Sequence, residues 1–383
     1  MKAFKPIVAI ALSLLLVAVL IPCGCGQAPD SHASIQGRLQ DLLDRVISQN
    51  DVPGIVLQVV DSRQGEWSVA SGMADINSQA PMDPTYRFRC ASNTKTFTAA
   101  AIMLLEQEGL LQLDDPIAKY VPELHIPLDS VVTIRHLLAH QSGMVDYAGN
   151  TQCLDILEED PLYAFTPEEL VQASIDAGSD FYPGTQFSYC NTGYVVAALI
   201  IEKANLEGLT YPEFIKAYLL EPLGLTDTFV AMDWKIPGNY AHGYSWSDED
   251  GFQDVTVINQ SFAFGCGNMV STVEDLARWA GALYGGEVLY ATFTAEMIDV
   301  MATGDPYHAY YGLGCTYTPG LGYGHDGGTA GYLSVMRYDT DNDVAIVTYM
   351  NEVSEDLHTL NDILYEIGYS AKRILGYDVP ETP

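Results

Sequence analysis

The sequence has few basic residues: Lys and Arg together number 17, against 50 Asp and Glu, for a formal net charge of −33. Phosphate backbones are bound by clustered Lys and Arg, so a nucleic acid is excluded as a partner. Electrostatic attraction to anionic lipids is excluded on the same ground. An acidic surface of this kind keeps a protein soluble and monodisperse, or suits a salty medium that screens self-repulsion.

The N-terminus departs from this acidity. Two lysines precede the apolar run 7–21, which is too short to span a bilayer comfortably, so residues 1–25 are predicted to be an export signal. The signal ends in IPCGCGQ, where Cys25 follows a glycine as at a bacterial lipoprotein cleavage site. Pro22 fits that site poorly, and Cys23 is the second candidate for lipidation. We expect an exported protein of the cell envelope, lipid-anchored or secreted; a plain cleaved signal and an uncleaved anchor stay open.

Cysteine is sparse in the remaining chain and lacks the spacing of a metal site. An odd number of scattered cysteines and the absence of a CxxC pair argue against a disulfide framework or a zinc site. We expect most of them to be small buried residues, with one disulfide left open. They are Cys90, Cys153, Cys190, Cys266 and Cys315.

Strand patterns occur near both ends of the chain, and helical patterns dominate between them. The order predicts an α+β fold, with one sheet built from both termini and an inserted helical lobe. The expected elements are a helix at 31–50, strands at 54–61, 66–72, 332–339 and 343–351, and a closing helix at 356–368. We assign one domain to residues 33–375, with 33–90 and 305–375 as its α/β part, 91–304 as a mainly helical lobe, and 376–383 as a flexible tail.

The stretch CASNTKTFTAA, residues 90–100, leads into an apolar run that predicts a buried helix ending near Gly109. Ser92 is either the start of that helix or a nucleophile. Lys95 stands in the first turn, where the helix dipole disfavours a cation by about 0.3–1 kcal/mol. Burial and the dipole both lower the pKa of a lysine, which makes it a proton acceptor. Ser-x-x-Lys at this position is therefore a candidate activated nucleophile.

Two further stretches carry polar groups beside predicted elements. Tyr189 and Asn191 precede a helix, where the phenol can pass on a proton and the amide can hold a carbonyl. His325 and Gly327 lie where a strand begins, and glycine there allows close approach of another backbone. Each has a structural alternative: a packing aromatic, an N-cap, and a glycine-rich loop with a polar histidine.

Two other features are weaker. His136 and His140 stand one helical turn apart, which suits metal ligation, but the Glu of HExxH is missing, so no metal is predicted. Cys190 lies between Tyr189 and Asn191 and is a candidate second nucleophile. No histidine adjoins it in sequence, and a small side chain suffices at that position.

In this order the three motifs resemble those of the serine β-lactamase and penicillin-binding-protein superfamily, on its class C β-lactamase-like branch. The motifs are Ser92-Asn93-Thr94-Lys95, Tyr189-Cys190-Asn191 and His325-Asp326-Gly327. The stretches LDDPIAKYVPEL, VTIRHLLAHQSGM, EPLGLTDT and MVSTVEDLARWAGAL are similar to that family as well. The resemblance covers about residues 36–368 and implies a three-layer αβα sandwich with a mainly antiparallel sheet and the site at its junction with the helical lobe.

The resemblance also implies a mechanism without metal or cofactor. Ser92 attacks an ester or amide carbonyl and forms an acyl-enzyme, which water then hydrolyses. Lys95 and Tyr189 share the work of the general base, and the order in which they act stays open. Asn191 orients the substrate. The backbone N–H groups of Ser92 and Gly328 form the oxyanion hole.

Departures from the family pattern bear on the substrate. Where β-lactam-hydrolysing relatives carry a lysine that helps hold a carboxylate, this chain has His325, a mostly neutral side chain at pH 7. The charge of Asp326 beside it is expected to repel a carboxylate. We therefore expect a small-molecule ester, amide or D-amino-acid derivative as substrate rather than a β-lactam. A D-alanyl-D-alanine carboxypeptidase or β-lactamase, and a non-catalytic penicillin-binding-like sensor, are the alternatives; the oligomeric state is not predicted.

Overall fold

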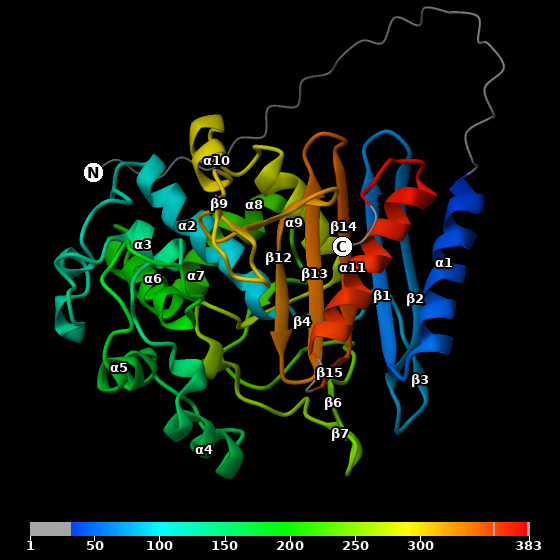
Figure 1. Cartoon of the computed structure of the whole chain (residues 1–383), viewed down its shortest axis with the longest axis horizontal. Helices are drawn as coiled ribbons and strands as arrows, with labels where there is room; N and C mark the ends of the chain where they lie inside the picture. Colours follow the sequence, from blue (N-terminus) through cyan, green and yellow to red (C-terminus); the bar gives the residue numbers. More distant parts are fainter. Residues whose placement is uncertain (1–31, 355–356, 381–383) are drawn as a thin grey trace, which may run out of the picture.

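The computed structural model describes residues 32–354 and 357–380, so the predicted signal, Cys25 and the last residues of the predicted tail lie outside the described ranges. Within these ranges, an antiparallel sheet of nine strands forms the centre of the molecule (Figure 1). Its order is β3 (Ala80–Pro81), β2 (Gly65–Asp75), β1 (Gly54–Asp61), β14 (Val344–Met350), β13 (Tyr332–Asp339), β12 (Gly322–Thr329), β11 (Thr316–Thr318), β10 (Tyr310–Tyr311) and β9 (Met301–Ala302).

The two ends of the chain meet in the middle of this sheet. β1 pairs antiparallel with β14, from Ile55 opposite Met350 to Asp61 opposite Val344. Side chains of β13 and β14 are buried along both strands, as expected for strands covered on both faces. The predicted sheet built from both termini, and with it the α+β class, is confirmed.

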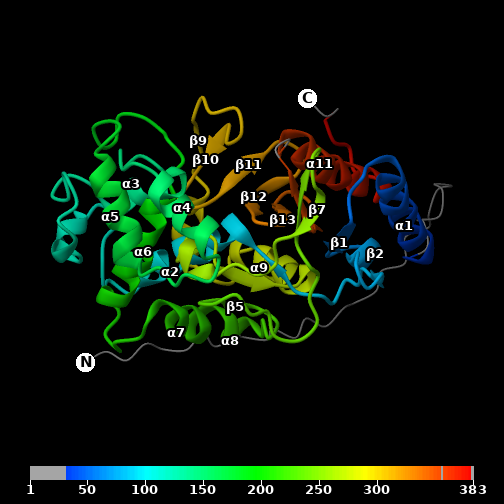
Figure 2. The same cartoon turned by 90° about the horizontal axis from the view of Figure 1, so that it is seen from below.

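Helices cover the two faces of the sheet. α1 (His32–Gln49) and α11 (Leu357–Ile374) pack side by side on one face (Figures 1 and 2). α9 (Val273–Tyr284) packs on β1, β13 and β14 from the other face. The residues of α9 were predicted to belong to the helical lobe, yet the apolar stripe of this helix packs on the sheet and covers it.

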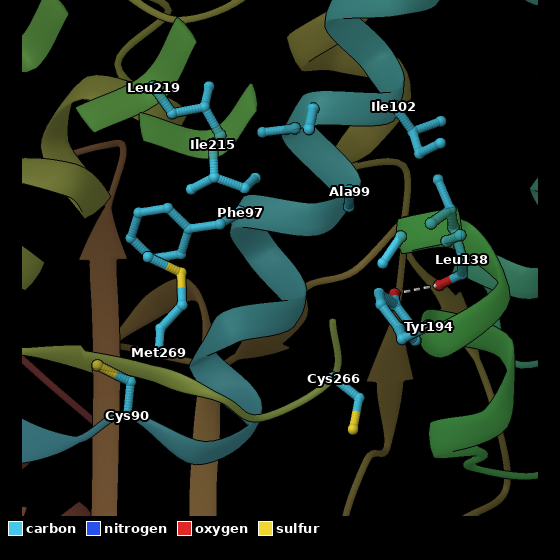
Figure 3. Close-up of a cluster of buried hydrophobic side chains, with 14 of the residues drawn as sticks. Cys90, Phe97, Ala99, Ile102, Leu138, Tyr194, Ile215, Leu219, Cys266 and Met269 are labelled. Atoms are coloured by element: carbon cyan, nitrogen blue, oxygen red, sulfur yellow. Dashed lines mark hydrogen bonds between the residues drawn. The ribbon is translucent and has the colours of Figure 1, made fainter. Parts of the chain in front are cut away.

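The helical lobe is built around α2 (Thr94–Gln107) and α6 (Asn191–Ala204), which pack against each other. Every residue of α2 from Thr94 to Leu105 is buried, as predicted from a run that is apolar on nearly all sides. In Figure 3, Phe97 and Ile215 lie on one side of α2, and Leu138 and Tyr194 lie on its other side. The surrounding helices are α3 (Ile134–Leu138), α4 (Thr151–Glu159), α5 (Pro167–Ala177), α7 (Tyr211–Ile215), α8 (Glu221–Leu223) and α10 (Ala291–Met297).

Two small sheets were not predicted, because their strands are too short to show a two-residue period. One contains β15 (Glu352–Ser354), β6 (Tyr244–Ser247) and β7 (Gly251–Asp254), and the other β4 (Phe88–Arg89), β8 (Met269–Ser271) and β5 (Phe229–Val230). The second sheet fixes the backbone just before Ser92, since Cys90 N–H donates to Met269 O at 2.8 Å. No helix among the described residues has the length and apolar character needed to cross a membrane.

Candidate active site

Ser92 lies in a single 3-10 turn, Ala91–Asn93, that leads directly into α2. Ala91 has a φ of +47°, a conformation that costs a non-glycine residue about 1–3 kcal/mol and persists only where neighbours hold it. Asn93 holds the turn against the sheet, because its Nδ2 donates to Ser334 Oγ of β13 at 2.8 Å. No side-chain capping bond forms at the start of the turn or of α2. The start of a helix therefore does not explain Ser92.

Lys95 is fully buried, and its Nζ reaches three oxygens: Ser92 Oγ at 3.0 Å, Asn191 Oδ1 at 2.8 Å and Cys266 O at 2.9 Å. Three acceptors match the three N–H bonds of an ammonium group. Without its proton the amine keeps two of these acceptors and turns its lone pair toward Ser92 Oγ. Burial lowers the pKa of Lys95, and the charge of Asp146 partly offsets that effect.

Tyr189 lies on the loop before α6, with Lys95 Nζ 4.8 Å from the centre of its ring. Burial raises the pKa of the Tyr189 phenol well above 10, and a hydrogen bond with Ser92 acts in the opposite direction. The phenol is therefore protonated in the resting site. Because burial lowers the pKa of Lys95 and raises that of Tyr189, Lys95 is the better first acceptor for the proton of Ser92.

Asn191 is the first residue of α6, and its side chain is held from both ends. Its Oδ1 accepts from Lys95, while its Nδ2 donates to Asp146 Oδ2 at 2.9 Å and its backbone N–H donates to Asp146 Oδ1 at 3.1 Å. Asp146 thus fixes the orientation of the amide that faces Lys95. Asp146 was not predicted from the sequence, because a lone carboxylate in an irregular segment forms no recognisable pattern.

The third motif lies on β12, whose free edge faces the Ser92 turn. Pairing with β11 ends at Gly324, so the residues of β12 beyond it have no strand neighbour on that side. A Cβ on Gly327 would stand 2.3 Å from Cys90 O and 2.4 Å from Ser334 Oγ. Glycine is required there so that strand and turn can touch. The expected contact of Gly327 with substrate stays a prediction. Gly328 follows on the exposed part of the same edge, and its role in an oxyanion hole stays a prediction.

His325 is completely buried on β12, and both of its ring nitrogens are engaged. Nε2 lies 2.8 Å from the hydroxyl of Tyr311, and Nδ1 lies 2.6 Å from the backbone oxygen of Asp326. Burial, with Lys95 and His308 nearby, lowers the pKa of His325 well below 6.5. The expected neutral state of this side chain agrees with its surroundings.

The expectation that Asp326 repels a substrate carboxylate is wrong. Because side chains alternate along a strand, Asp326 points to the sheet face opposite His325. There its carboxylate forms an ion pair with the buried Arg337 and accepts a hydrogen bond from Tyr365 of α11 at 2.7 Å. Its charge is thus neutralised on the far side of β12.

The weaker candidates of the sequence analysis take structural places. All five cysteines of the described ranges are buried and free of disulfides, and burial raises the pKa of the Cys190 thiol to about 12. His136 Nδ1 accepts the backbone N–H of Thr133 at 3.2 Å, whereas His140 bonds to Tyr311. No group of metal-ligating side chains is found among the described residues.

A cavity of about 590 Å³ lies between the segment before β10, β11 and α11, and its wall includes Arg337. His308 lines this cavity and also stacks on Tyr189, with ring centres 4.4 Å apart, whereas Ser92 and Lys95 do not line it. A space of this size accommodates a small organic ligand. Aromatic rings form much of its wall: Tyr307, Tyr310, Tyr317, Tyr365 and Tyr369.

Comparison with known proteins gives this geometry a context. The Beta-lactamase family model matches residues 37–367. Penicillin-binding protein 4* of Bacillus subtilis (strain 168) is 30% identical over 365 residues, covering 90% of this chain and 78% of that protein.

Two solved structures share the fold over most of their length. The D-amino acid amidase from Ochrobactrum anthropi SV3, complexed with L-phenylalanine amide, has a TM-score of 0.80 at 28% identity and covers 88% of this chain and 99% of its own. The D-stereospecific amidohydrolase from Streptomyces sp. has a TM-score of 0.75 at 28% identity, covering 83% of this chain and 94% of its own.

Proposed function

The chain belongs to the Beta-lactamase family of serine acyl-transfer hydrolases, and from that membership we propose that it is an exported enzyme that cleaves esters or amides through an acyl-enzyme on Ser92. D-Amino-acid amides and esters that lack a C-terminal carboxylate are its preferred substrates. The observation that carries this preference is His325, which is buried with both ring nitrogens engaged.

In the proposed reaction, Ser92 Oγ passes its proton to neutral Lys95 Nζ while it attacks the carbonyl carbon. The backbone N–H groups of Ser92 and Gly328 stabilise the oxyanion, each being worth about 10²–10³ in rate. Tyr189 then relays the proton from Lys95 to the leaving nitrogen or oxygen, whose bond to the carbonyl carbon breaks. Water attacks the acyl-enzyme and gives a proton to the same base. The base returns that proton to Ser92 Oγ as the acyl bond breaks and the acid leaves.

The substrate preference depends on which side chains of the site can donate a hydrogen bond to a substrate carboxylate. A neutral histidine whose one N–H is already donated has none to offer an anion. Lys95, charged or neutral, has its N–H donors directed to protein oxygens. The two amide-hydrolysing relatives of similar fold support an amide substrate.

The similarity to penicillin-binding protein 4* favours one second candidate, a carboxypeptidase or β-lactamase that acts on peptidoglycan-type substrates. A non-catalytic sensor is a weaker alternative. A binding protein has no need of a lysine buried at a cost in solvation and directed at a serine hydroxyl.

Export belongs to the proposal as well. It is supported by the apolar run 7–21 behind two lysines and by the lipoprotein-like position of Cys25. Lipid attached to Cys25 would tie the enzyme to a membrane surface. Replacing Cys25 with Ser should release it into the soluble fraction of cells that express the full chain.

The test is a substrate panel run with the wild type and with Ser92→Ala. It contains p-nitrophenyl esters, D- and L-phenylalanine amides, a D-Ala-D-Ala peptide and nitrocefin, together with labelling by a fluorophosphonate. We expect Ser92-dependent labelling, and turnover of the uncharged ester and D-amide at least tenfold above that of the peptide and nitrocefin. Efficient nitrocefin hydrolysis would overturn the substrate preference, and a folded protein without Ser92-dependent labelling or turnover would overturn the enzyme.

A further inference from the structure

Three side chains form a continuous buried chain of hydrogen bonds beneath the site. His140, just after α3, lies with its Nε2 3.0 Å from the hydroxyl of Tyr311 on β10, and that hydroxyl lies 2.8 Å from His325 Nε2 on β12. The three are at most 1% exposed. The chain ends on backbone at both sides, at the N–H of Cys190 and at the carbonyl of Asp326.

The two ends fix the direction of every bond when both histidines are neutral. Cys190 N–H donates to His140 Nδ1 at 3.0 Å, so the proton of His140 is on Nε2 and is donated to Tyr311. His325 Nδ1 lies 2.6 Å from a carbonyl oxygen, which can only accept, so the proton of His325 is on Nδ1. His325 Nε2 must then accept, and the hydroxyl of Tyr311 is its donor.

We infer that Tyr311 and His140 are positioning residues for the proposed reaction: they hold His325 as its Nδ1–H tautomer, so that the position offers no N–H to a substrate carboxylate. Neither residue touches the reacting atoms. This inference rests on the proposed function only where it concerns substrate choice. The chain also ties β12 to the loop that carries Tyr189, because its far end is the residue after Tyr189.

The charges around His325 agree with a neutral ring. Lys95 of α2, His308 of the segment before β10 and Arg337 of β13 all disfavour a second positive charge. The Asp326 carboxylate lies on the opposite face with Arg337 and Tyr365. The remaining titratable groups whose rings approach His325 or its partners are Tyr189, Tyr194, Tyr311 and His140.

Replacing Tyr311 with Phe removes the only donor to His325 Nε2 found among the described residues. Because that bond favours the neutral ring, its loss raises the pKa of His325. A protonated ring then has an unused Nε2–H for which a substrate carboxylate is a suitable acceptor. The test compares kcat/KM for an ester that bears a carboxylate with kcat/KM for the same ester bearing a carboxamide in its place. In Tyr311→Phe, the ratio of the first to the second should rise by about tenfold as the pH falls from 8 to 5.5. The wild-type ratio should stay flat.

The first readout is ¹⁵N NMR of histidine-labelled protein, assigned with His140→Gln and His325→Gln. We expect His140 as Nε2–H and His325 as Nδ1–H, both neutral from pH 8 to pH 5.5. The opposite tautomer of either ring, or its protonation within that range, would overturn the inference. This readout needs no substrate, so it stands if the proposed function fails.

Two comparisons separate positioning from general damage. Tyr211→Phe removes another buried hydroxyl, bonded to Thr98 at 2.8 Å in the helical lobe, and should leave the substrate ratio at its wild-type value. His140→Gln keeps an N–H directed at Tyr311 and should preserve the wild-type ratio, whereas His140→Ala should not. A substrate ratio that does not change with pH in folded Tyr311→Phe contradicts the inference. If Tyr311→Phe does not fold, the comparison of His140→Gln with His140→Ala decides instead, and equal ratios in those two variants contradict the inference. Absence of wild-type turnover would instead count against the proposed function.

Discussion

At the scale of single residues, the site depends on burying a lysine that, within the described ranges, has no carboxylate in direct contact. Lys95 is surrounded by a hydroxyl, an amide oxygen and a backbone carbonyl, and the carboxylate of Asp146 is linked to it through Asn191. Desolvation favours the neutral amine, while Asp146 favours the charged one. The balance between these two effects sets the pH at which Ser92 acquires a base.

Replacing Asp146 with Asn tests that balance. Activity requires neutral Lys95, so kcat/KM rises with pH as Lys95 loses its proton. Removing the negative charge disfavours the protonated amine, which lowers the pKa of Lys95 and moves the acidic limb of the profile to lower pH. The plateau should fall about tenfold, because Asn191 loses a fixed partner.

The measurement is kcat/KM for an uncharged ester across the pH range, with Asp155→Asn, an exposed carboxylate of α4, as the control. A limb that stays in place or moves to higher pH would show that Lys95 is not the group that titrates.

Sequence patterns reached some of these residues and not others. Ser92, Lys95, Tyr189, Asn191 and His325 were picked out by short motifs, and the structure brings them together around Lys95. The residues that set the orientation and protonation of these side chains were not predicted. Asp146, His140 and Tyr311 are distant in sequence from the residues they contact, and only folding brings them together. The direction of Asp326 was misjudged for a related reason: its neutralising partner, Arg337, stands on the next strand.

At the scale of elements, catalysis depends on the contact between β12 and the turn before α2. The long strands and helices were predicted from their periodicity, and β1 and β13 have the predicted bounds. The short strands β4 and β8 carry no such signal, yet β4–β8 pairing positions the backbone before Ser92. Elements of two or three residues are stabilised by tertiary contacts alone, so they lie beyond local patterns.

Gly327→Ala should separate β12 from the Ser92 turn. The added Cβ would meet Cys90 O at 2.3 Å and Ser334 Oγ at 2.4 Å, and neither backbone nor a bonded hydroxyl yields easily. A displacement of about 1 Å costs roughly 10²-fold in rate, so kcat/KM should fall by that amount. The melting temperature should fall as well, because overpacking costs about 1–3 kcal/mol.

Gly328→Ala provides the comparison one residue further along β12. Its Cβ would meet only Leu333 Cδ2 at 3.2 Å, the end of a flexible side chain, and the backbone N–H is retained. We expect a clearly smaller loss of kcat/KM than in Gly327→Ala. Equal losses in the two variants would mean that the edge of β12 tolerates no side chain and that close approach to Cys90 is not the cause.

At the scale of the whole molecule, the surface keeps the acidity of the composition, because burial removes four basic and three acidic residues of the described ranges from solvent. Of the 17 basic residues in the chain, four within the described ranges are at most 2% exposed: Arg89, Lys95, Arg337 and Lys372. All four lie against carboxylates, aromatic rings or backbone oxygens inside the protein. The solvent-facing charge is therefore strongly negative, and a substrate meets that field before it meets the site.

Such a field raises the local concentration of cations and lowers that of anions, and added salt screens both effects. For esters that differ only in charge, kcat/KM of the cationic ester should fall with NaCl and that of the anionic ester should rise, while the neutral one stays level. A change of about tenfold between 10 mM and 500 mM salt is expected for the charged pair. His325 selects by hydrogen bonding at contact distance, which salt screens much less, so a preference against carboxylates should persist at 500 mM. If the anionic ester reached the kcat/KM of the neutral one there, the long-range field alone would account for selectivity, and the buried chain from His140 to His325 would have no part in it.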